Sequence, residues 1–364
     1  MSDPEVGIGL CLSGGGYRAM LFHTGVLWRL NELGFLAKIQ RVSSVSGGSI
    51  TAALLGLKWR RLGFNEGIAA KYYDEVVVPI RELGRQSIDT MSVVTGILTP
   101  GSISEKIADK YERFLFQGMS LQDLPTTPRF VINATNVQSG VLWRFTKPYM
   151  GDYRVGRIHN PTVKLALAVA ASSAFPPLLS PLVMEVDPNS FLPNSGDDLQ
   201  YQPFTSKVFL TDGGVYDNLG LEPVWGRYKT ILASDAGGGF AAEPQPRSDW
   251  VSHSYRILNV IDHQVRSLRK RWLIEAFKAG TSQDGTYWGI RTNIADYGLN
   301  DHLPCAFENT IKLANIATCL DHLDDQVQEK LINWGYAVCD AAMRRHVVLG
   351  APPPNDFPYP NSRV

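Results

Sequence analysis

The sequence predicts an α/β fold organised around a parallel sheet, and three observations support this. Residues 7–12 and 39–45 are apolar runs too short for ordinary helices, and each ends in a turn of serine and glycine. The first run is followed by residues 18–33, whose apolar positions recur at helical spacing, and the second by residues 49–55, which fit a buried helix. Strands that alternate with helices are typical of βαβ units, in which successive strands run parallel. We therefore expect a mostly parallel central sheet.

The rest of the chain continues this mixture of strands and helices. Residues 60–125 are expected to be mainly helical, with glycine and proline breaks at 99–101. The other expected strands are 130–134, 141–145, 208–210 and 230–233. The other expected helices are 165–173, 250–277 and 325–346, and a long surface loop is expected at 187–203.

The sequence shows no internal repeat and no linker between independent domains. We therefore expect one domain over residues 1–350. Residues 351–364 are rich in proline and are expected to lie extended on the surface as a C-terminal tail.

The composition argues against several classes of protein. Lys plus Arg number 35 and Asp plus Glu number 35, so no net charge favours a nucleic-acid partner. The four cysteines lack the density of a disulfide framework. The start of the chain is polar and acidic, unlike a signal peptide, and no apolar run reaches the roughly 18 residues of a membrane-spanning helix. We expect a cytoplasmic protein for which any membrane contact is peripheral.

Residues 44–48, Ser-Val-Ser-Gly-Gly, form an S-x-S-x-G variant of the nucleophile elbow G-x-S-x-G. A serine between a strand and a helix, with small neighbours, can occupy a tight turn that exposes its hydroxyl group. The N-terminus of the following helix favours developing negative charge. By itself the pattern also fits an ordinary turn, so Ser46 is a candidate nucleophile only in combination with other groups.

Residues 13–16 place three consecutive glycines between a strand and a helix. Their bare N–H groups can form a nest for an oxyanion or a phosphate. A flexible turn and a dinucleotide-binding loop are the alternatives, since residues 14–19 satisfy G-x-G-x-x-A. Dinucleotide binding also requires an acidic residue at the end of the second strand, where residues 43–46 contain only serine and valine. No Walker A loop is present, and we expect no cofactor.

Asp212 follows an apolar segment and precedes two glycines. An Asp-Gly pair most often forms a turn. Because Asp212 follows an expected strand, as Ser46 does, both side chains can lie at the carboxyl edge of one sheet. That edge is where open α/β sheets bind their ligands.

In order and in spacing, these segments resemble the patatin-like phospholipase family. The matching segments are Gly-Gly-Gly-Tyr-Arg at 14–18, the elbow at 44–48, Ala-Thr-Asn at 134–136, Ala-Ser-Ser-Ala-Phe-Pro at 171–176 and Asp-Gly-Gly at 212–214. The resemblance extends over residues 7–240, and the helical C-terminal part is similar to bacterial members. Ala19 and Ser44 stand where the family often has glycine, so we expect the local geometry to be perturbed but kept.

The resemblance implies a three-layer α/β/α fold and an enzyme that hydrolyses lipid carboxylic esters through an acyl-enzyme intermediate. It implies a dyad without histidine, in which Ser46 is the nucleophile and Asp212 is the general base. The implied oxyanion hole is formed by Gly14, Gly15 and Gly16. Arg18 matches a basic position that holds the glycine loop or meets a phosphate. An aspartate that acts as a base near neutral pH requires a desolvated site that raises its pKa.

Other arrangements of the site stay open. A Ser–Asp–His triad of the α/β-hydrolase type is compatible with the order of the residues, because five histidines follow Asp212: His253, His263, His302, His322 and His346. Against it, the elbow comes only one βα unit into the chain, and none of the histidines lies in a glycine-rich loop. Asp217 and Asp235 compete with Asp212 for the role of base, but neither belongs to an Asp-Gly-Gly segment.

Three further features have two interpretations each. Arg266, Arg269, Lys270 and Arg271 form either a solvated helix face or a patch for lipid headgroups. Residues 80–105 form either an apolar lid over the site or a helical insertion. The whole protein is either a hydrolase or a non-catalytic binding or storage protein with the same fold. Phospholipids, lysophospholipids, acylglycerols and small esters share one carbonyl chemistry, so the substrate stays open.

Overall fold

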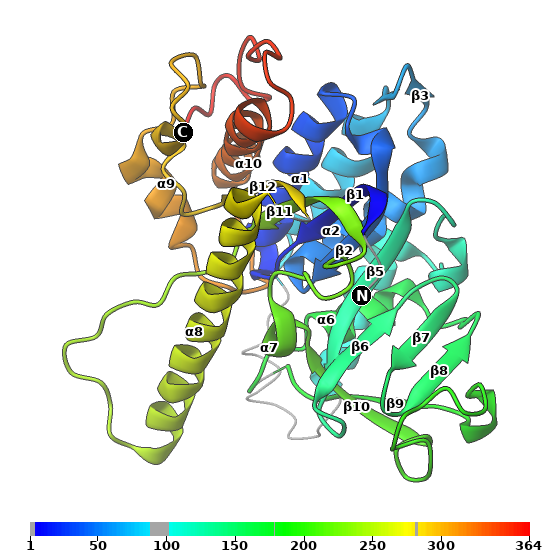
Figure 1. Cartoon of the computed structure of the whole chain (residues 1–364). Helices are drawn as coiled ribbons and strands as arrows, with labels where there is room; N and C mark the ends of the chain where they lie inside the picture. The colour runs from blue at the N-terminus through cyan, green and yellow to red at the C-terminus, as the bar shows by residue number, and fades with distance from the viewer. Residues whose placement is uncertain (1–3, 88–101, 178, 281–282) are drawn as a thin grey trace.

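The computed structural model describes residues 4–87, 102–177, 179–280 and 283–364 (Figure 1). The strands of the main sheet are β1 (Glu5–Leu12), β2 (Ile39–Val45), β5 (Arg129–Asn136), β6 (Val141–Phe145), β7 (Tyr149–Asp152), β8 (Gly156–His159), β9 (Leu182–Glu185), β10 (Lys207–Asp212), β11 (Tyr228–Asp235) and β12 (Asp284–Gly289). The α-helices are α1 (Gly16–Glu32), α2 (Gly47–Lys58), α3 (Val78–Gly84), α5 (Ser102–Tyr111), α6 (Leu165–Ser172), α7 (Gly214–Asp217), α8 (Trp250–Ala279), α9 (Phe307–Ala314) and α10 (Asp325–His346).

The centre of the sheet consists of five parallel strands in the order β12-β11-β1-β2-β5. Beyond β5 the sheet continues antiparallel through β6, β7 and β8. The α/β fold with a mostly parallel central sheet is therefore confirmed. The sequence analysis missed β12 and the short strands β7, β8 and β9, which carry glycines or last only four residues.

Strands β2 and β10 share one edge of β5 and meet end to end. β2 pairs in parallel with β5 from Arg129 to Asn133. β10 pairs antiparallel with the next three residues of β5, so that Asp212 lies opposite Ala134. Because the other edge of β5 is taken by β6, the carboxyl ends of β2 and β10 face each other. The sequence analysis expected Ser46 and Asp212 at one sheet edge, and they are brought together by this head-to-head arrangement instead.

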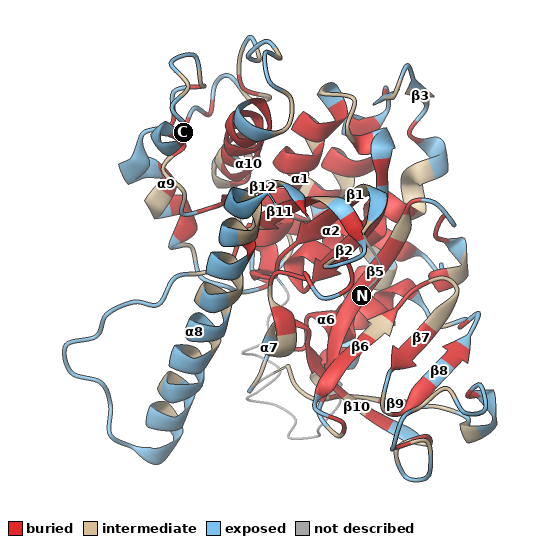
Figure 2. Cartoon of the chain, in the orientation of Figure 1, coloured by how far each residue is buried: buried red, intermediate tan, exposed pale blue. Residues whose placement is uncertain are grey.

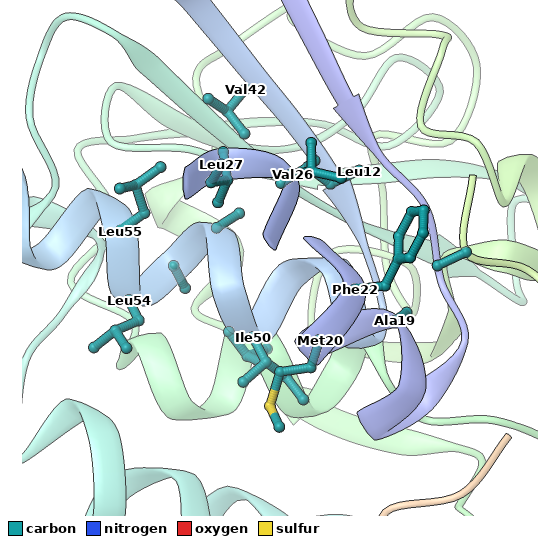
Figure 3. Packing of buried hydrophobic residues seen from close by; sticks show 14 of the residues in the cluster. Leu12, Ala19, Met20, Phe22, Val26, Leu27, Val42, Ile50, Leu54 and Leu55 are labelled. Atoms are coloured by element: carbon teal, nitrogen blue, oxygen red, sulfur yellow. The ribbon is translucent and has the colours of Figure 1, made fainter. Parts of the chain in front are cut away.

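Side chains along the central strands point alternately to the two faces of the sheet, where they form two apolar clusters. Leu10, Leu12 and Leu232 belong to a large cluster shared with α1, α2, α6 and α10. Cys11 and Ile231 belong to a smaller cluster completed by Leu273 of α8 and by the segment 219–228. Figure 3 shows the large cluster where residues of α1 and α2 pack over β1 and β2. The result is a layered structure with helices on both faces of the sheet.

Helices α1 and α10 pack unusually closely because each carries a glycine at the crossing. A Cβ on Gly25 of α1 would lie 1.9 Å from the carbonyl oxygen of Ile332, and one on Gly335 of α10 would lie 2.0 Å from that of Phe22. Neither position can therefore take a larger residue without separating the helices. This contact joins the C-terminal part of the chain to the sheet domain.

Of two peripheral regions with expectations from the sequence, the structure describes only the C-terminal tail in full. The C-terminal tail is tied down, because the Asn333 side chain donates to the carbonyls of Tyr359 and Ser362 at 2.9 and 2.8 Å and Phe357 is buried. Of residues 80–105, the stretch 88–101 lies outside the described residues, so neither a lid nor an insertion is assigned there.

Helix α8 is the most exposed element of the part of the chain that the structure describes. It runs along the outside of the molecule, and Figure 2 shows it mostly in the colour of exposed residues, with stretches of intermediate burial. Leu273 is its single buried residue. Within the described residues, no helix combines the length and the apolar character needed to cross a bilayer.

Candidate active site

Ser46 occupies the turn between β2 and α2 in a conformation that few non-glycine residues adopt. Its φ is 51° and its ψ is −123°, and such strain persists only where the surroundings hold it. The following residues must be glycine: a Cβ on Gly47 would lie 2.0 Å from the Gly16 carbonyl oxygen, and one on Gly48 would lie 2.5 Å from that of Leu12. The elbow is therefore packed backbone to backbone against the glycine loop 13–16.

Ser172, at the end of α6, holds the elbow in place. Its hydroxyl accepts a hydrogen bond from the Ser46 N–H at 2.9 Å and donates to the Asn133 carbonyl at 2.6 Å. The Ser49 hydroxyl lies 2.9 Å from that of Ser172 and donates to the Ser44 hydroxyl at 3.0 Å. Ser44 stands where the elbow motif usually has its first glycine, and its hydroxyl is accommodated there by this hydrogen-bond network. The sequence analysis noted the segment that contains Ser172 but assigned it no role.

Asp212 lies at the end of β10 in a dry environment. Its side chain is 2% exposed and accepts the N–H of Gly214 at 2.7 Å. Burial raises its pKa from the usual carboxyl value to about 7, and the Gly214 N–H and the Ser46 hydroxyl limit that rise. The charge of Asp262, on α8, raises the pKa further. Among the described residues, no cation pairs with this carboxylate, and it stands ready to take up a proton near neutral pH.

The two predicted dyad residues come together. The Ser46 hydroxyl approaches the Asp212 carboxylate closely enough to lower its pKa as a hydrogen-bond donor, although the two atoms do not form a hydrogen bond of standard geometry. Gly14 and Gly213 make room around them, since a Cβ on Gly14 would lie 3.0 Å from that of Ser46 and one on Gly213 would lie 2.3 Å from the Asn133 carbonyl oxygen. Small residues are thus required on both sides of the pair.

The glycine loop presents two unpaired N–H groups beside Ser46. Gly15 and Gly16 have φ of 146° and 62°, which glycine adopts without strain. The N–H of Gly14 is already used, because it donates to the Asn218 carbonyl at 3.2 Å. Those of Gly15 and Gly16 have no acceptor among the described residues. Of the three predicted oxyanion donors, these two are therefore free in this conformation.

Arg18 supports the loop from behind. Its guanidinium donates to the carbonyl of Ala236 at 3.1 Å, to the hydroxyl of Thr318 at 3.1 Å and to the carbonyl of Ile316. The side chain is buried and forms no ion pair with any residue the structure describes. Of the two predicted roles, the contacts favour holding the loop.

The competing residues are engaged elsewhere. Asp217 is fully buried, accepts the N–H of Glu222 at 2.8 Å and faces Arg269 at 3.8 Å. None of the seven histidines hydrogen-bonds to Ser46 or Asp212. His23, the buried one, binds Ser13 and Ser234, and burial lowers its pKa to about 4. Within the described residues, no group of three or more His, Cys, Asp or Glu side chains is arranged to hold a metal ion.

The fold is similar to that of solved structures. Human GIVD cytosolic phospholipase A2 in complex with methyl gamma-linolenyl fluorophosphonate is similar over 93% of this chain and 58% of that chain, with 14% identity and a TM-score of 0.51. VipD from Legionella pneumophila is 15% identical over 93% of this chain and 66% of its own, with a TM-score of 0.37. Full-length ExoU from Pseudomonas aeruginosa, solved with SpcU, is 16% identical over 74% of this chain and 53% of its own, with a TM-score of 0.27.

The chain spans about half the length of the phospholipase structures it matches, at 45%, 40% and 58% of three GIVD structures. The sequence matches none of the curated proteins. The model of the patatin-like phospholipase family, however, matches residues 10–225, which is more than half of the chain and includes the glycine loop, the elbow and Asp212. The chain therefore belongs to the patatin-like phospholipase family.

Proposed function

We propose that the protein is a lipid acyl hydrolase in which Ser46 attacks the ester carbonyl and Asp212 acts as general base. The observation that carries the proposal is the meeting of a strained elbow serine with a buried carboxylate whose pKa is raised to about 7. Membership of the patatin-like phospholipase family, together with the fold shared with human GIVD cytosolic phospholipase A2, supports an ester of a lipid as the substrate.

In this mechanism Asp212 accepts the proton of the Ser46 hydroxyl as its oxygen bonds to the acyl carbon. The negative charge that forms on the carbonyl oxygen is held by the N–H groups of Gly15 and Gly16, and one such donor contributes roughly 10²–10³ in rate. The alcohol leaves with a proton from Asp212. Water, deprotonated by the same carboxylate, then hydrolyses the acyl-enzyme. If an alcohol takes the place of water, the same steps give transacylation.

The raised pKa matches this cycle. A base is most effective when its pKa lies near the working pH, because it is then both partly ionised and basic enough to accept the proton. With an ordinary carboxyl pKa near 3.9, Asp212 would be a much weaker base. A histidine is not required, and no histidine reaches the pair.

Peripheral contact with a lipid surface is part of the proposal, and helix α8 supports it. Its outward face carries exposed apolar side chains, among them Trp250, Leu258, Ile261 and Leu268. An amphipathic helix with aromatic and aliphatic side chains on one face can lie in the interfacial region of a bilayer. The opposite face approaches the active site, since Asp262 of this helix acts on Asp212. Such a position would bring the site to the lipid.

The test is hydrolysis of p-nitrophenyl esters of increasing acyl length and of a phosphatidylcholine by the wild type, Ser46→Ala and Asp212→Asn. We expect wild-type turnover and its loss in both variants, with thermal unfolding used to verify that each variant folds. The ratio of the two substrate types separates a phospholipase from a general esterase. Activity that survives in Ser46→Ala, or no wild-type turnover on any ester, would overturn the proposal in favour of a binding or storage protein.

A further inference from the structure

A cavity lies at the carboxyl ends of β11 and β12, under helix α8. Its volume is about 230 Å³, which is less than the roughly 300–1,000 Å³ of pockets for drug-sized ligands. It therefore suits a compact group better than a whole lipid. The residues that line it include Asp235, Gly237–Gly239, Arg266, Lys270, Tyr287 and Arg291.

The charged side chains of this cavity are mostly cationic. Arg266, Lys270 and Arg291 line it, against the single carboxylate of Asp235. That carboxylate is already satisfied: it accepts the Tyr287 hydroxyl at 2.8 Å and the Gly237 N–H at 2.9 Å. Neither Lys270 nor Arg291 forms an ion pair with any residue the structure describes. Arg291 donates to the Asn315 Oδ1 at 2.8 Å and Lys270 lies 5.8 Å from the centre of the Tyr287 ring, so both cations have neutral partners only.

The donors of Arg266 are poorly used. Its Nη1 lies 3.4 Å from Asp262 and its Nη2 lies 3.8 Å from Asp235, both long for a charge-assisted hydrogen bond. Its Nε is buried and has no partner among the described residues. A buried donor without an acceptor destabilises the fold, and an acceptor in the cavity would remove that cost.

Three consecutive glycines let the guanidinium groups lie directly on the backbone. A Cβ on Gly237 would fall 1.8 Å from Nη2 of Arg266, and one on Gly239 would fall 2.8 Å from Cζ of Arg291. Larger residues would push these side chains out of the cavity. A glycine run that exposes N–H groups beside cations is typical of anion-binding concavities.

Arg18 adds to the positive field from behind the same glycines. A Cβ on Gly238 would lie 3.3 Å from its Nη2. Burial lowers the pKa of Arg18 to about 10, and repulsion from Arg266 contributes to the shift, with a smaller effect from Arg291. Arg266 and Arg291 are therefore close enough to repel Arg18, and an anion in the cavity would relieve that repulsion.

We propose that this cavity binds a phosphate group. Arginine forks match phosphate oxygens in a bidentate way, lysine adds a mobile point charge, and a phosphate carries enough oxygens to engage all of them. Strand β11 is two strands from β2 in the sheet, so the cavity lies on the order of 10 Å from Ser46. The phosphate is either the headgroup of an ester substrate, which rests on the proposed function, or free phosphate.

Binding is measured by calorimetric titration with inorganic phosphate, independently of catalysis. We expect saturable binding to the wild type, weakened about 10- to 100-fold in Lys270→Gln and in Arg291→Gln. Arg291→Lys keeps the charge and should recover part of the affinity. Arg271→Gln is the matched control, because Arg271 lies on the same helix but points to solvent, and it should bind as the wild type does.

Kinetics then separate the two sources of the phosphate. The substrates are a short-chain phosphatidic acid and the diacylglycerol with the same chains. A headgroup site predicts that Arg291→Gln lowers kcat/KM about 10- to 100-fold for the phosphatidic acid and leaves the diacylglycerol unchanged. A site for free phosphate predicts that Arg291→Gln leaves kcat/KM unchanged for both esters although phosphate binding is lost.

The proposal and the proposed function can fail separately. Phosphate binding without hydrolysis of any ester would support the phosphate site and overturn the proposed hydrolase activity. The opposite result would be hydrolysis by a wild type that shows no measurable phosphate binding, with kcat/KM for both esters unchanged in Arg291→Gln and Lys270→Gln. It would overturn the phosphate site and leave the proposed hydrolase activity in place. Circular dichroism of each variant excludes loss of folding as the cause.

Discussion

Asp212 and Asp235 have the same local setting and different surroundings. Each ends a strand of one sheet, and each accepts an N–H from two residues further along the chain, at 2.7 Å for Asp212 and 2.9 Å for Asp235. Among the residues that the structure describes, the Asp212 carboxylate has no further partner except the nearby Ser46 hydroxyl. Asp235 also accepts the Tyr287 hydroxyl at 2.8 Å and faces Arg266 at 3.8 Å.

The difference lies in what the sheet places beside each carboxylate. β10 ends head to head against β2, so Asp212 is buried beside the elbow serine and away from cations. β11 lies between two parallel strands and ends under α8, so Asp235 meets the cations of that helix. Two aspartates that each end a strand and precede a glycine-rich turn thus have opposite electrostatic environments, one suited to take up a proton and the other to position cations.

The largest expected effect is on catalysis. Asp212→Asn removes the base and is expected to lower kcat/KM for a p-nitrophenyl ester by roughly 10⁴-fold, as removal of a catalytic carboxylate does elsewhere. Asp235→Asn is expected to cost no more than about 10-fold, because it only disturbs the contacts of Tyr287 and Arg266. Steady-state rates of the two variants, measured side by side, check the contrast. Equal losses would abolish the functional distinction between the two aspartates.

The next effect is on stability. Because the pKa of Asp212 rises from the usual value near 3.8 to about 7 on folding, the folded state holds a proton that the unfolded state has lost between these pH values. Its ionisation therefore destabilises the fold as pH rises, by up to about 4 kcal/mol above pH 7. Asp212→Asn should be more stable than the wild type at pH 8, with the gap closing toward pH 4, in urea unfolding. A wild type that is the more stable protein at pH 8 would contradict the buried, unpaired carboxylate.

The third-largest expected effect concerns the N–H donors of the oxyanion hole. Gly15→Ala would place a Cβ 2.8 Å from the Ala236 carbonyl oxygen at a φ of 146°, so the loop must shift. We expect a loss of roughly 10²–10³ in kcat, the value of one displaced donor. Gly34→Ala is the control, since Gly34 also has a positive φ but no atom lies within 4 Å of its Cβ position, and its activity should be kept. Loss of activity in both variants would point to general destabilisation.

The smallest effect concerns the support of the elbow. Ser172→Ala removes the acceptor of the Ser46 N–H and is expected to cost about 10-fold in kcat, in line with roughly 1–2 kcal/mol for a buried hydrogen bond. Ser49→Ala breaks the neighbouring bonds to Ser172 and Ser44 but leaves the acceptor of the Ser46 N–H in place, so it should cost less. A larger loss in Ser49→Ala than in Ser172→Ala would show that the network, and not the bond to Ser46, holds the turn.

The sequence predicted the local parts of this site well. The strand at 39–45 and the helix at 325–346 have the boundaries expected, because apolar runs and helical spacing are local signals. The three motifs also indicated Ser46, the glycine loop and Asp212 correctly as neighbours. The direction of β10 could not be predicted, since it depends on which edge of β5 is free.

Long-range contacts explain the remaining differences. The use of the Gly14 N–H by Asn218 depends on a loop some two hundred residues away in the chain. The cluster at 266–271 was expected to be either solvated or a headgroup patch, yet Arg266 and Lys270 line a cavity closed by β12, a strand the sequence analysis missed. Arg269 instead reaches Asp217 and Glu222. Charge patterns along one helix do not reveal what packs against its inner face.

The most direct test of the dyad is covalent labelling with an alkyl fluorophosphonate, which reacts with an activated serine, followed by peptide mass mapping. We expect a single adduct on Ser46 in the wild type and in Asp235→Asn, with a labelling rate that rises with pH through about 7 as Asp212 ionises. Labelling of Asp212→Asn should be slow at every pH. An adduct on another serine, or equal labelling of Asp212→Asn and the wild type, would contradict a nucleophile at Ser46 activated by Asp212.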